Sequence, residues 1–183
     1  FVEIAIKNIY EKFKLKNGLQ VTTASEFSSK FGFGSSSAST VCIVKALSEL
    51  LLLNLGNKQI FDLAYKTVLD IQGKGSGFDV AAAVYGGTLY FVTGGKAIQP
   101  LNIDSLPLIV GYSGIKADTV TLINQVKEKF SDKADRLEEL YAGMTEIVEK
   151  AKPLIVASNW LEVGELMSDN QKLLKELGVS IRK

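Results

Sequence analysis

Apolar residues recur at intervals of three and four positions over most of this chain, the spacing that places side chains on one face of an α-helix. The first such stretch has apolar residues at Val2, Ile6, Ile9, Tyr10 and Phe13. The last one ends at Gly178, a residue type that commonly follows the final turn of a helix. The pattern predicts helices over residues 2–13, 38–53, 60–71, 78–85, 117–130, 137–156 and 160–177.

Three shorter stretches favour β-strands. Residues 19–23 and 88–93 are rich in the alternating and β-branched positions of strands, and residues 107–112 form a short apolar run. The composition changes between residues 102 and 107, because strands and glycine-rich loops mix before this point and helices dominate after it. We therefore expect an α+β chain with two domains, residues 1–104 and 105–183.

The composition excludes several classes of function. Of 183 residues, 46% are apolar and 22% charged, and the net charge is +1, so we expect neither nucleic acid nor a membrane as a partner. Histidine is absent, which excludes Ser-His-Asp and Cys-His catalysis and histidine metal sites. The single cysteine, Cys42, cannot form an intrachain disulfide, which favours a cytoplasmic location, and we expect it to be a buried apolar side chain.

A glycine- and serine-rich loop precedes the second predicted helix. Gly32 and Gly34 are one residue apart, and Ser35, Ser36 and Ser37 follow directly. Glycines let a backbone approach an anion, and a helix start offers unpaired N–H groups and a positive dipole end, so the loop predicts a phosphate site. The pattern matches neither the Walker motif nor the dinucleotide fingerprint. The alternative is a flexible Gly-Ser loop with a serine as the helix N-cap.

A second glycine-rich loop, residues 73–77, precedes an isolated carboxylate, Asp79. An aspartate at a helix start is commonly an N-cap, and this alternative stays open here. The functional interpretation is that Asp79 accepts or orients a hydroxyl proton during phosphoryl transfer, with the flanking glycines leaving room for the ligand.

Taken together, these segments resemble the GHMP small-molecule kinases. Residues 32–38 (GFGSSSA) are similar to the phosphate loop of that family, and residues 72–83 (QGKGSGFDVAAA) to the catalytic-aspartate segment of its mevalonate and phosphomevalonate kinase branch. Residues 110–119 (VGYSGIKADT) and 161–171 (LEVGELMSDNQ) resemble the second half of archaeal-type mevalonate kinases. The resemblance implies a fold of two-layer α/β sandwich halves, with a truncated N-terminal domain followed by a ferredoxin-like, helix-rich C-terminal domain.

The resemblance also implies a reaction, ATP- and Mg²⁺-dependent phosphoryl transfer to the hydroxyl of a small isoprenoid-pathway acid. Mevalonate is the acceptor we expect, and 5-phosphomevalonate is the alternative. Asp79 is implied to be the catalytic residue and Ser36 the magnesium ligand. The residues implied to bind the ATP phosphates are Gly32, Phe33, Gly34, Ser35, Ser36 and Ser37. A homodimer is an assembly that the resemblance allows.

The chain departs from the family pattern at three places. Mevalonate kinases usually carry a magnesium-binding glutamate where this chain has Val68, and the nearest acid is Asp70. The family's opening Pro-Gly-Lys segment and its closing Gly-Ala-Gly-Gly-Gly loop do not occur in these residues, so we expect the chain alone to be inactive. Two rival hypotheses remain, a nucleotide- or phosphate-binding module without catalysis and a purely structural α/β protein.

Overall fold

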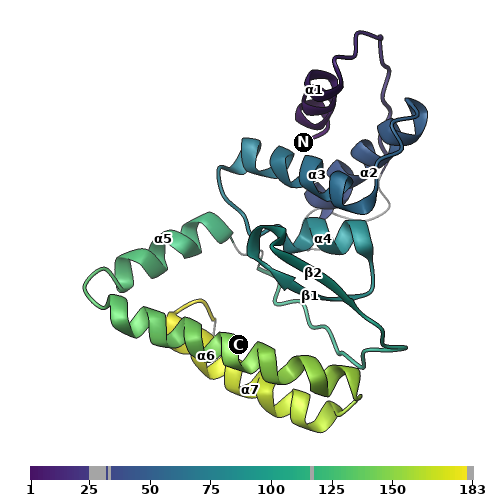
Figure 1. Cartoon of the computed structure of the whole chain (residues 1–183). Helices are drawn as coiled ribbons and strands as arrows, with labels where there is room; N and C mark the ends of the chain where they lie inside the picture. The colour runs from purple at the N-terminus through teal and green to yellow at the C-terminus, as the bar shows by residue number, and fades with distance from the viewer. Residues whose placement is uncertain (25–31, 33, 116–117, 181–183) are drawn as a thin grey trace. The chain divides into compact units, whose positions relative to one another are not determined.

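The computed structural model describes residues 1–24, 32, 34–115 and 118–180 (Figure 1). Its elements, in chain order, are α1 (Val2–Phe13), α2 (Ser35–Leu50), α3 (Asn57–Gln72), α4 (Phe78–Tyr85), β1 (Thr88–Val92), the 3₁₀ turn η2 (Thr93–Gly95), β2 (Ala97–Leu101), α5 (Thr119–Lys129), α6 (Ala134–Val156) and α7 (Trp160–Leu177). They form two compact units, Phe1–Leu101 (unit 1) and Asn102–Lys183 (unit 2).

All seven predicted helices are confirmed, with ends shifted by a few residues, and so is the strand over 88–92. The strands predicted over 19–23 and 107–112 are wrong, since both segments are irregular. A strand needs a neighbour to pair its backbone N–H and C=O groups, and within the described residues neither segment is paired in a sheet. In the second segment the side chains of Leu108, Ile109 and Val110 are exposed.

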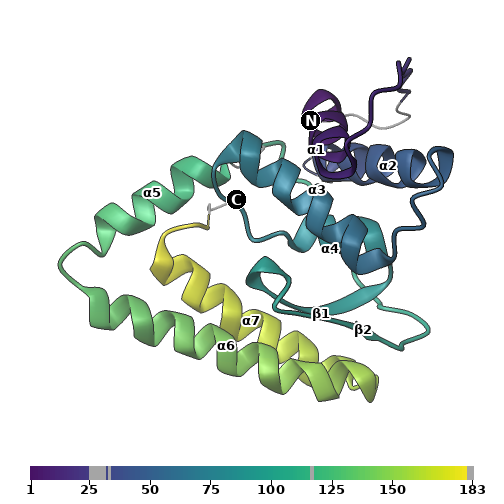
Figure 2. The same ribbon diagram turned by 45° about the horizontal axis from the view of Figure 1, so that its top comes forward.

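Unit 1 is built around a helical core. The core contains Ile9 of α1, Val44 of α2 and Phe61 of α3, all without exposed surface. Helices α1, α2 and α3 pack against one another, and α4 packs on α2 and α3 (Figures 1 and 2). Strands β1 and β2 form an antiparallel hairpin in which Thr88 pairs with Leu101 and Val92 with Ala97, and α4 contacts β1. The unit is therefore a helix-rich α+β layer, as expected.

Cys42 corrects one expectation, because its side chain is exposed rather than buried. Helix α2 buries Val41, Val44 and Leu47, which are spaced three residues apart and so lie on one face of the helix. Position 42 falls outside that face, and the apolar character of the sequence around it does not change the direction of its side chain.

Unit 2 contains α5, α6 and α7. Helices α6 and α7 follow each other through a short turn and lie side by side in both views (Figures 1 and 2). The core of the unit is small and consists of Val126 of α5, Phe130 directly after α5, Leu140 of α6 and Leu177 of α7. The regular elements described in this unit are all helices, and residues 102–115 are irregular, so the strands of a ferredoxin-like domain are not among its described residues. Within the described ranges, no helix is both long and apolar enough to cross a lipid bilayer.

Candidate functional site

Helix α2 begins at a glycine that has no side chain to cap it. Gly34 is the N-cap residue, with φ 70° and ψ 27°, a left-handed conformation that favours glycine. The first intrahelical hydrogen bond runs from the Ala38 N–H to the Gly34 carbonyl oxygen at 2.9 Å. The N–H groups of Ser35, Ser36 and Ser37 in the first turn have no acceptor within the helix, and the glycine offers them no side-chain oxygen. The alternative of a serine N-cap is therefore wrong for this helix.

The residues predicted to bind the phosphates differ in how exposed they are to solvent. Ser35 and Ser36 are half-buried, Ser37 is only 1% exposed, and Gly32 is exposed. Phe33, the remaining residue expected to bind the phosphates, lies outside the described residues. The Thr40 hydroxyl donates a hydrogen bond at 2.8 Å to the backbone carbonyl oxygen of Ser36, not to its side chain.

Helix α4 starts in the same way and brings Asp79 to the start of α2. Its N-cap is Gly77, with φ 87° and ψ 4°, and Asp79 lies in the first turn. Asp79 is therefore not the N-cap that the sequence left open, although its charge favours the positive end of the helix dipole. A Cβ atom added to Gly34 would lie 3.7 Å from the Cβ of Asp79, so the two helix starts are close together.

Asp79 accepts hydrogen bonds from both sides in this position. The Ser37 hydroxyl donates to its Oδ2 across the gap between the two loops, and the Val80 N–H donates to its Oδ1 at 3.0 Å. The carboxylate is half-buried, so part of its surface stays accessible to a ligand. Ser37 and Asp79 are 42 residues apart in the sequence, so this contact brings together the two segments that the sequence singled out.

The chemistry of this donor set suits a phosphorylated ligand. The uncapped N–H groups of α2 and the positive ends of two helices favour anionic oxygens. The hydroxyl oxygens and the Asp79 carboxylate are hard ligands of the type that Mg²⁺ prefers. Among the described residues, no group of three or more Cys, Asp and Glu side chains could hold a metal ion by itself. A magnesium ion would therefore have to take further ligands from phosphate and water.

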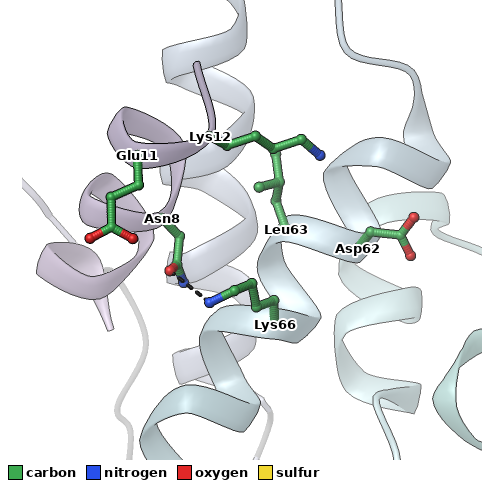
Figure 3. A pocket seen from close by; sticks show the side chains of 6 residues that line it. All are labelled: Asn8, Glu11, Lys12, Asp62, Leu63 and Lys66. Atoms are coloured by element: carbon green, nitrogen blue, oxygen red, sulfur yellow. Dashed lines mark hydrogen bonds between the residues drawn. The ribbon is translucent and has the colours of Figure 1, made fainter. Parts of the chain in front are cut away.

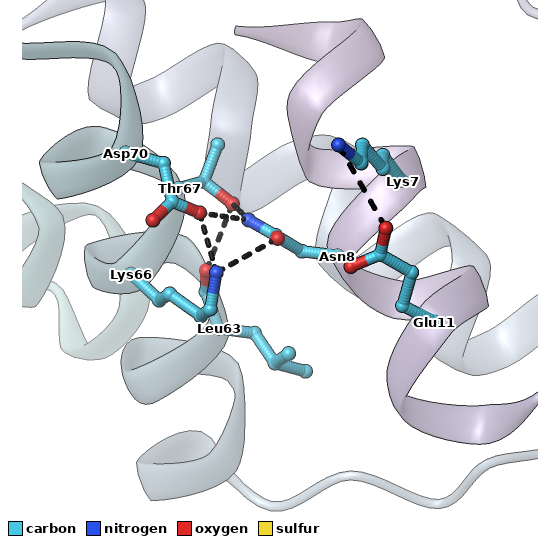
Figure 4. Close-up of polar contacts among 7 residues, drawn as sticks. All are labelled: Lys7, Asn8, Glu11, Leu63, Lys66, Thr67 and Asp70. Carbon is cyan, nitrogen blue, oxygen red and sulfur yellow. Dashed lines mark hydrogen bonds and ion pairs between the residues drawn. The ribbon is translucent and has the colours of Figure 1, made fainter.

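The position of the family's magnesium-binding glutamate is part of the core in this chain. Val68 is 4% exposed and packs in the cluster around Phe61. Asp70, the nearest acid, points instead toward α1, where its Oδ2 accepts hydrogen bonds from Lys66 at 2.5 Å and from Asn8 at 2.8 Å (Figure 4). Both hydrogen bonds lower the pKa of Asp70 below its ordinary value, and the bond from Lys66 has the larger effect. Asp70 thus serves the α1–α3 contact.

A shallow groove lies between α1 and α3, and Asn8 and Lys66, the hydrogen-bond partners of Asp70, are part of its lining (Figure 3). Its volume is about 500 Å³, and it is lined by Asn8, Glu11, Lys12, Asp62, Leu63 and Lys66. None of the residues predicted to bind ATP or to act in catalysis is among them. The lining combines two acids with two bases, and its most buried polar side chain, Asn8, is already hydrogen-bonded to Thr67, Asp70 and Lys66.

Sequence reasoning missed the residue that holds the second loop. That residue is Tyr65 of α3, which belongs to none of the motifs described above; its hydroxyl donates to the Gly75 carbonyl oxygen at 2.8 Å. The available signal was the four-residue spacing between Phe61 and Tyr65, which puts two aromatic rings on one face of α3 directly before the loop.

Comparisons with known proteins agree with the sequence resemblance. Residues 1–87 match the model of the GHMP kinases N terminal domain. The mevalonate kinases of Pyrococcus abyssi and Pyrococcus horikoshii are 33% and 34% identical to this chain over 188 residues, which is 100% of the chain and 56% of each relative. The mevalonate kinase of Saccharolobus solfataricus is 30% identical over 92% of the chain. The chain thus spans about half the length of the curated relatives it matches.

Two solved structures show the same fold. Mevalonate kinase of L. major, in complex with R-mevalonate, superposes with a TM-score of 0.72 at 24% identity and covers 99% of this chain and 57% of its own. The Lin0012 protein from Listeria innocua superposes with a TM-score of 0.80 at 20% identity and covers 97% of this chain and 59% of its own. The comparisons thus agree that residues 1–87 form a GHMP kinases N terminal domain, and that the chain over its whole length is similar to mevalonate kinases.

Proposed function

We propose that the protein containing this chain transfers the γ-phosphoryl group of ATP to the hydroxyl of mevalonate, giving 5-phosphomevalonate and ADP. The observation that carries the proposal is the contact between Asp79 and the start of α2, since it places a carboxylate directly beside an uncapped helix terminus. The mevalonate kinases among the relatives support the choice of acceptor. When bound, MgATP supplies the phosphoryl group and part of the charge that offsets the phosphate oxygens.

The residues of the chain then have separate roles. The first-turn N–H groups of Ser35, Ser36 and Ser37 bind the phosphate oxygens, and the Ser36 hydroxyl is the proposed magnesium ligand. The Asp79 carboxylate binds the acceptor hydroxyl and takes its proton while the O–P bond to the acceptor forms and the bond from the γ-phosphorus to the ADP oxygen breaks. Positioning and electrostatic stabilisation then account for most of the rate.

The experiment compares Asp79→Asn with the wild type in the intact protein that contains this chain. Loss of a general base costs about 10²- to 10⁴-fold in kcat, so kcat should fall by that amount while the Kd for ATP changes little. Asp104→Asn is the matched control, because Asp104 is an exposed carboxylate in the other unit. Normal turnover of the Asp79 variant would refute the catalytic role of this residue.

A second candidate, phosphorylation of 5-phosphomevalonate, is favoured by one observation. The position of the magnesium-binding glutamate is a buried valine, Val68, and phosphomevalonate kinases tend to lack that glutamate as well. Assays of the wild-type protein with each acid as the acceptor distinguish the two candidates. A larger kcat/KM for 5-phosphomevalonate would replace the first proposal by the second and would leave the role of Asp79 unchanged.

A further inference from the structure

The loop that leads to Asp79 is held from outside at three successive residues. The Gly75 carbonyl oxygen accepts the hydrogen bond from the Tyr65 hydroxyl at 2.8 Å. The Ser76 carbonyl oxygen accepts one from the Gly94 N–H at 2.9 Å. Gly77, the N-cap of α4, lies against the Tyr65 ring so closely that an added Cβ would be 2.9 Å from its Cδ2 and Cε2 atoms.

The Tyr65 side chain that makes two of these contacts is itself fixed. Its ring stacks on Phe61, with the two centroids 5.5 Å apart and the planes 24° from parallel. Phe61 has no exposed surface and also packs edge-on against Phe91 of β1 at 6.2 Å. A ring locked in this way places its hydroxyl at a defined point, so the hydrogen bond fixes the loop as well as satisfying a carbonyl group.

We infer that Tyr65 is a positioning residue for the reaction, which sets the place of Asp79 through the Gly75–Gly77 backbone. Asp79 follows Gly77 by two residues, and its other anchor, the hydrogen bond from Ser37, comes from the opposite loop. The carboxylate is thus held between one contact on the α2 side and the aromatic pair on the α3 side. This inference rests on the proposed function, since it assigns Tyr65 a part in the same phosphoryl transfer.

Tyr65→Phe is the variant that tests it, because it keeps the ring and removes only the hydroxyl. Displacement of a catalytic carboxylate by a fraction of an ångström should lower kcat about three- to ten-fold, with the Kd for ATP changed less than about two-fold. Tyr10→Phe is the matched control, since the Tyr10 hydroxyl is a buried oxygen for which the described residues provide no hydrogen-bond partner. Its kcat should equal that of the wild type.

A double-mutant comparison separates positioning from general stability. If Tyr65 acts through Asp79, Tyr65→Phe should have no further effect on the residual rate of the Asp79→Asn protein, because the group it positions is already gone. An equal fold-reduction in both backgrounds, or an unchanged kcat in the Tyr65 variant, would overturn the inference.

Amide hydrogen exchange tests the same contact without relying on activity. Loss of the Tyr65 hydroxyl should speed exchange of the amides between Gly73 and Val80, and loss of the Tyr10 hydroxyl should leave their exchange unchanged. Unchanged exchange in the Tyr65 variant would overturn the inference even in an active protein. A wild-type protein that transfers no phosphate to either acid would instead refute the proposed function, and the exchange result would still decide whether Tyr65 holds the loop.

Discussion

Replacing Gly95 with alanine should destabilise unit 1 through a clash with one ring of the core. An added Cβ would be in steric conflict with Cε1 of Phe61 and would lie 2.8 Å from its Cζ. Gly94 provides the matched control, because a Cβ added there meets no atom within 4 Å. The two glycines have similar backbone conformations, with φ 71° at Gly95 and 79° at Gly94, so both substitutions carry the same conformational penalty.

The magnitude follows from these two contributions. An alanine in the left-handed region costs about 1–2 kcal/mol, which applies to both variants. Overpacking of a core costs a further ~1–3 kcal/mol, which applies to Gly95→Ala alone because Phe61 is fully buried between Tyr65 and Phe91 and has little room to move. We therefore expect a loss of about 1–2 kcal/mol for Gly94→Ala and about 2–5 kcal/mol for Gly95→Ala.

Urea unfolding of the intact protein, followed by far-ultraviolet circular dichroism, measures both losses as differences in the free energy of unfolding. A Phe61→Leu substitution should partly relieve the clash, so the double variant with Gly95→Ala should lose less than the two single losses combined, by about 1 kcal/mol or more. Equal losses for the two glycine variants, together with additivity in the double variant, would refute the reasoning, since they would show that the ring yields freely.

Three further predictions concern other parts of the chain. Gly77→Ala should lower kcat more than Gly73→Ala does, because a Cβ at Gly77 would strike the Tyr65 ring while one at Gly73 meets no atom within 4 Å; steady-state kinetics of the two variants checks this. Leu140→Ala should lower the free energy of unfolding of unit 2 by about 2–5 kcal/mol, since the side chain is 1% exposed, and urea titration measures the loss. The hydrogen bond from Lys66 is the main cause of the lowered pKa of Asp70, so the ionised carboxylate stabilises the fold at pH values above about 4, the pKa of Asp in the unfolded chain. The free energy of unfolding of the wild type should therefore exceed that of Asp70→Asn by less and less as the pH falls through the lowered native pKa. Urea unfolding at a series of pH values measures this difference.

Helices and the hairpin strand β1 could be predicted because their signals are local. The three- and four-residue spacing of apolar positions and the glycines that follow them are properties of each segment alone. The strands expected over 19–23 and 107–112 could not be decided in this way, since a strand depends on a neighbour that may be far away in sequence. Cys42 shows the same limit at one residue, because apolar composition does not state which side of a helix faces the core.

The sequence singled out the two loops that meet at the candidate site, but not all of the contacts between them. The glycine pattern singled out both loops, and the structure places Asp79 beside Gly34 and Ser37. Nothing in the order of the three serines distinguishes Ser37 as the partner of Asp79, since their burial depends on the first turn of α2. The contact of Tyr65 with Gly75 was missed for a related reason, because the sequence does not indicate which acceptor a tyrosine hydroxyl on an apolar helix face will reach.

On the proposed function, the glycine N-cap of α2 would couple phosphate binding to folding. A serine or aspartate at this position would satisfy an N–H group of the first turn at all times, although such a cap stabilises a helix by only a few tenths of a kcal/mol relative to glycine. With Gly34 as the N-cap, the phosphate that we propose to bind here would accept hydrogen bonds from these N–H groups, and its binding free energy would add to the stability of unit 1. At a ligand concentration 100 times its Kd this linkage would amount to about 2.7 kcal/mol, so a rise in the melting temperature would identify the phosphorylated compounds that bind as proposed.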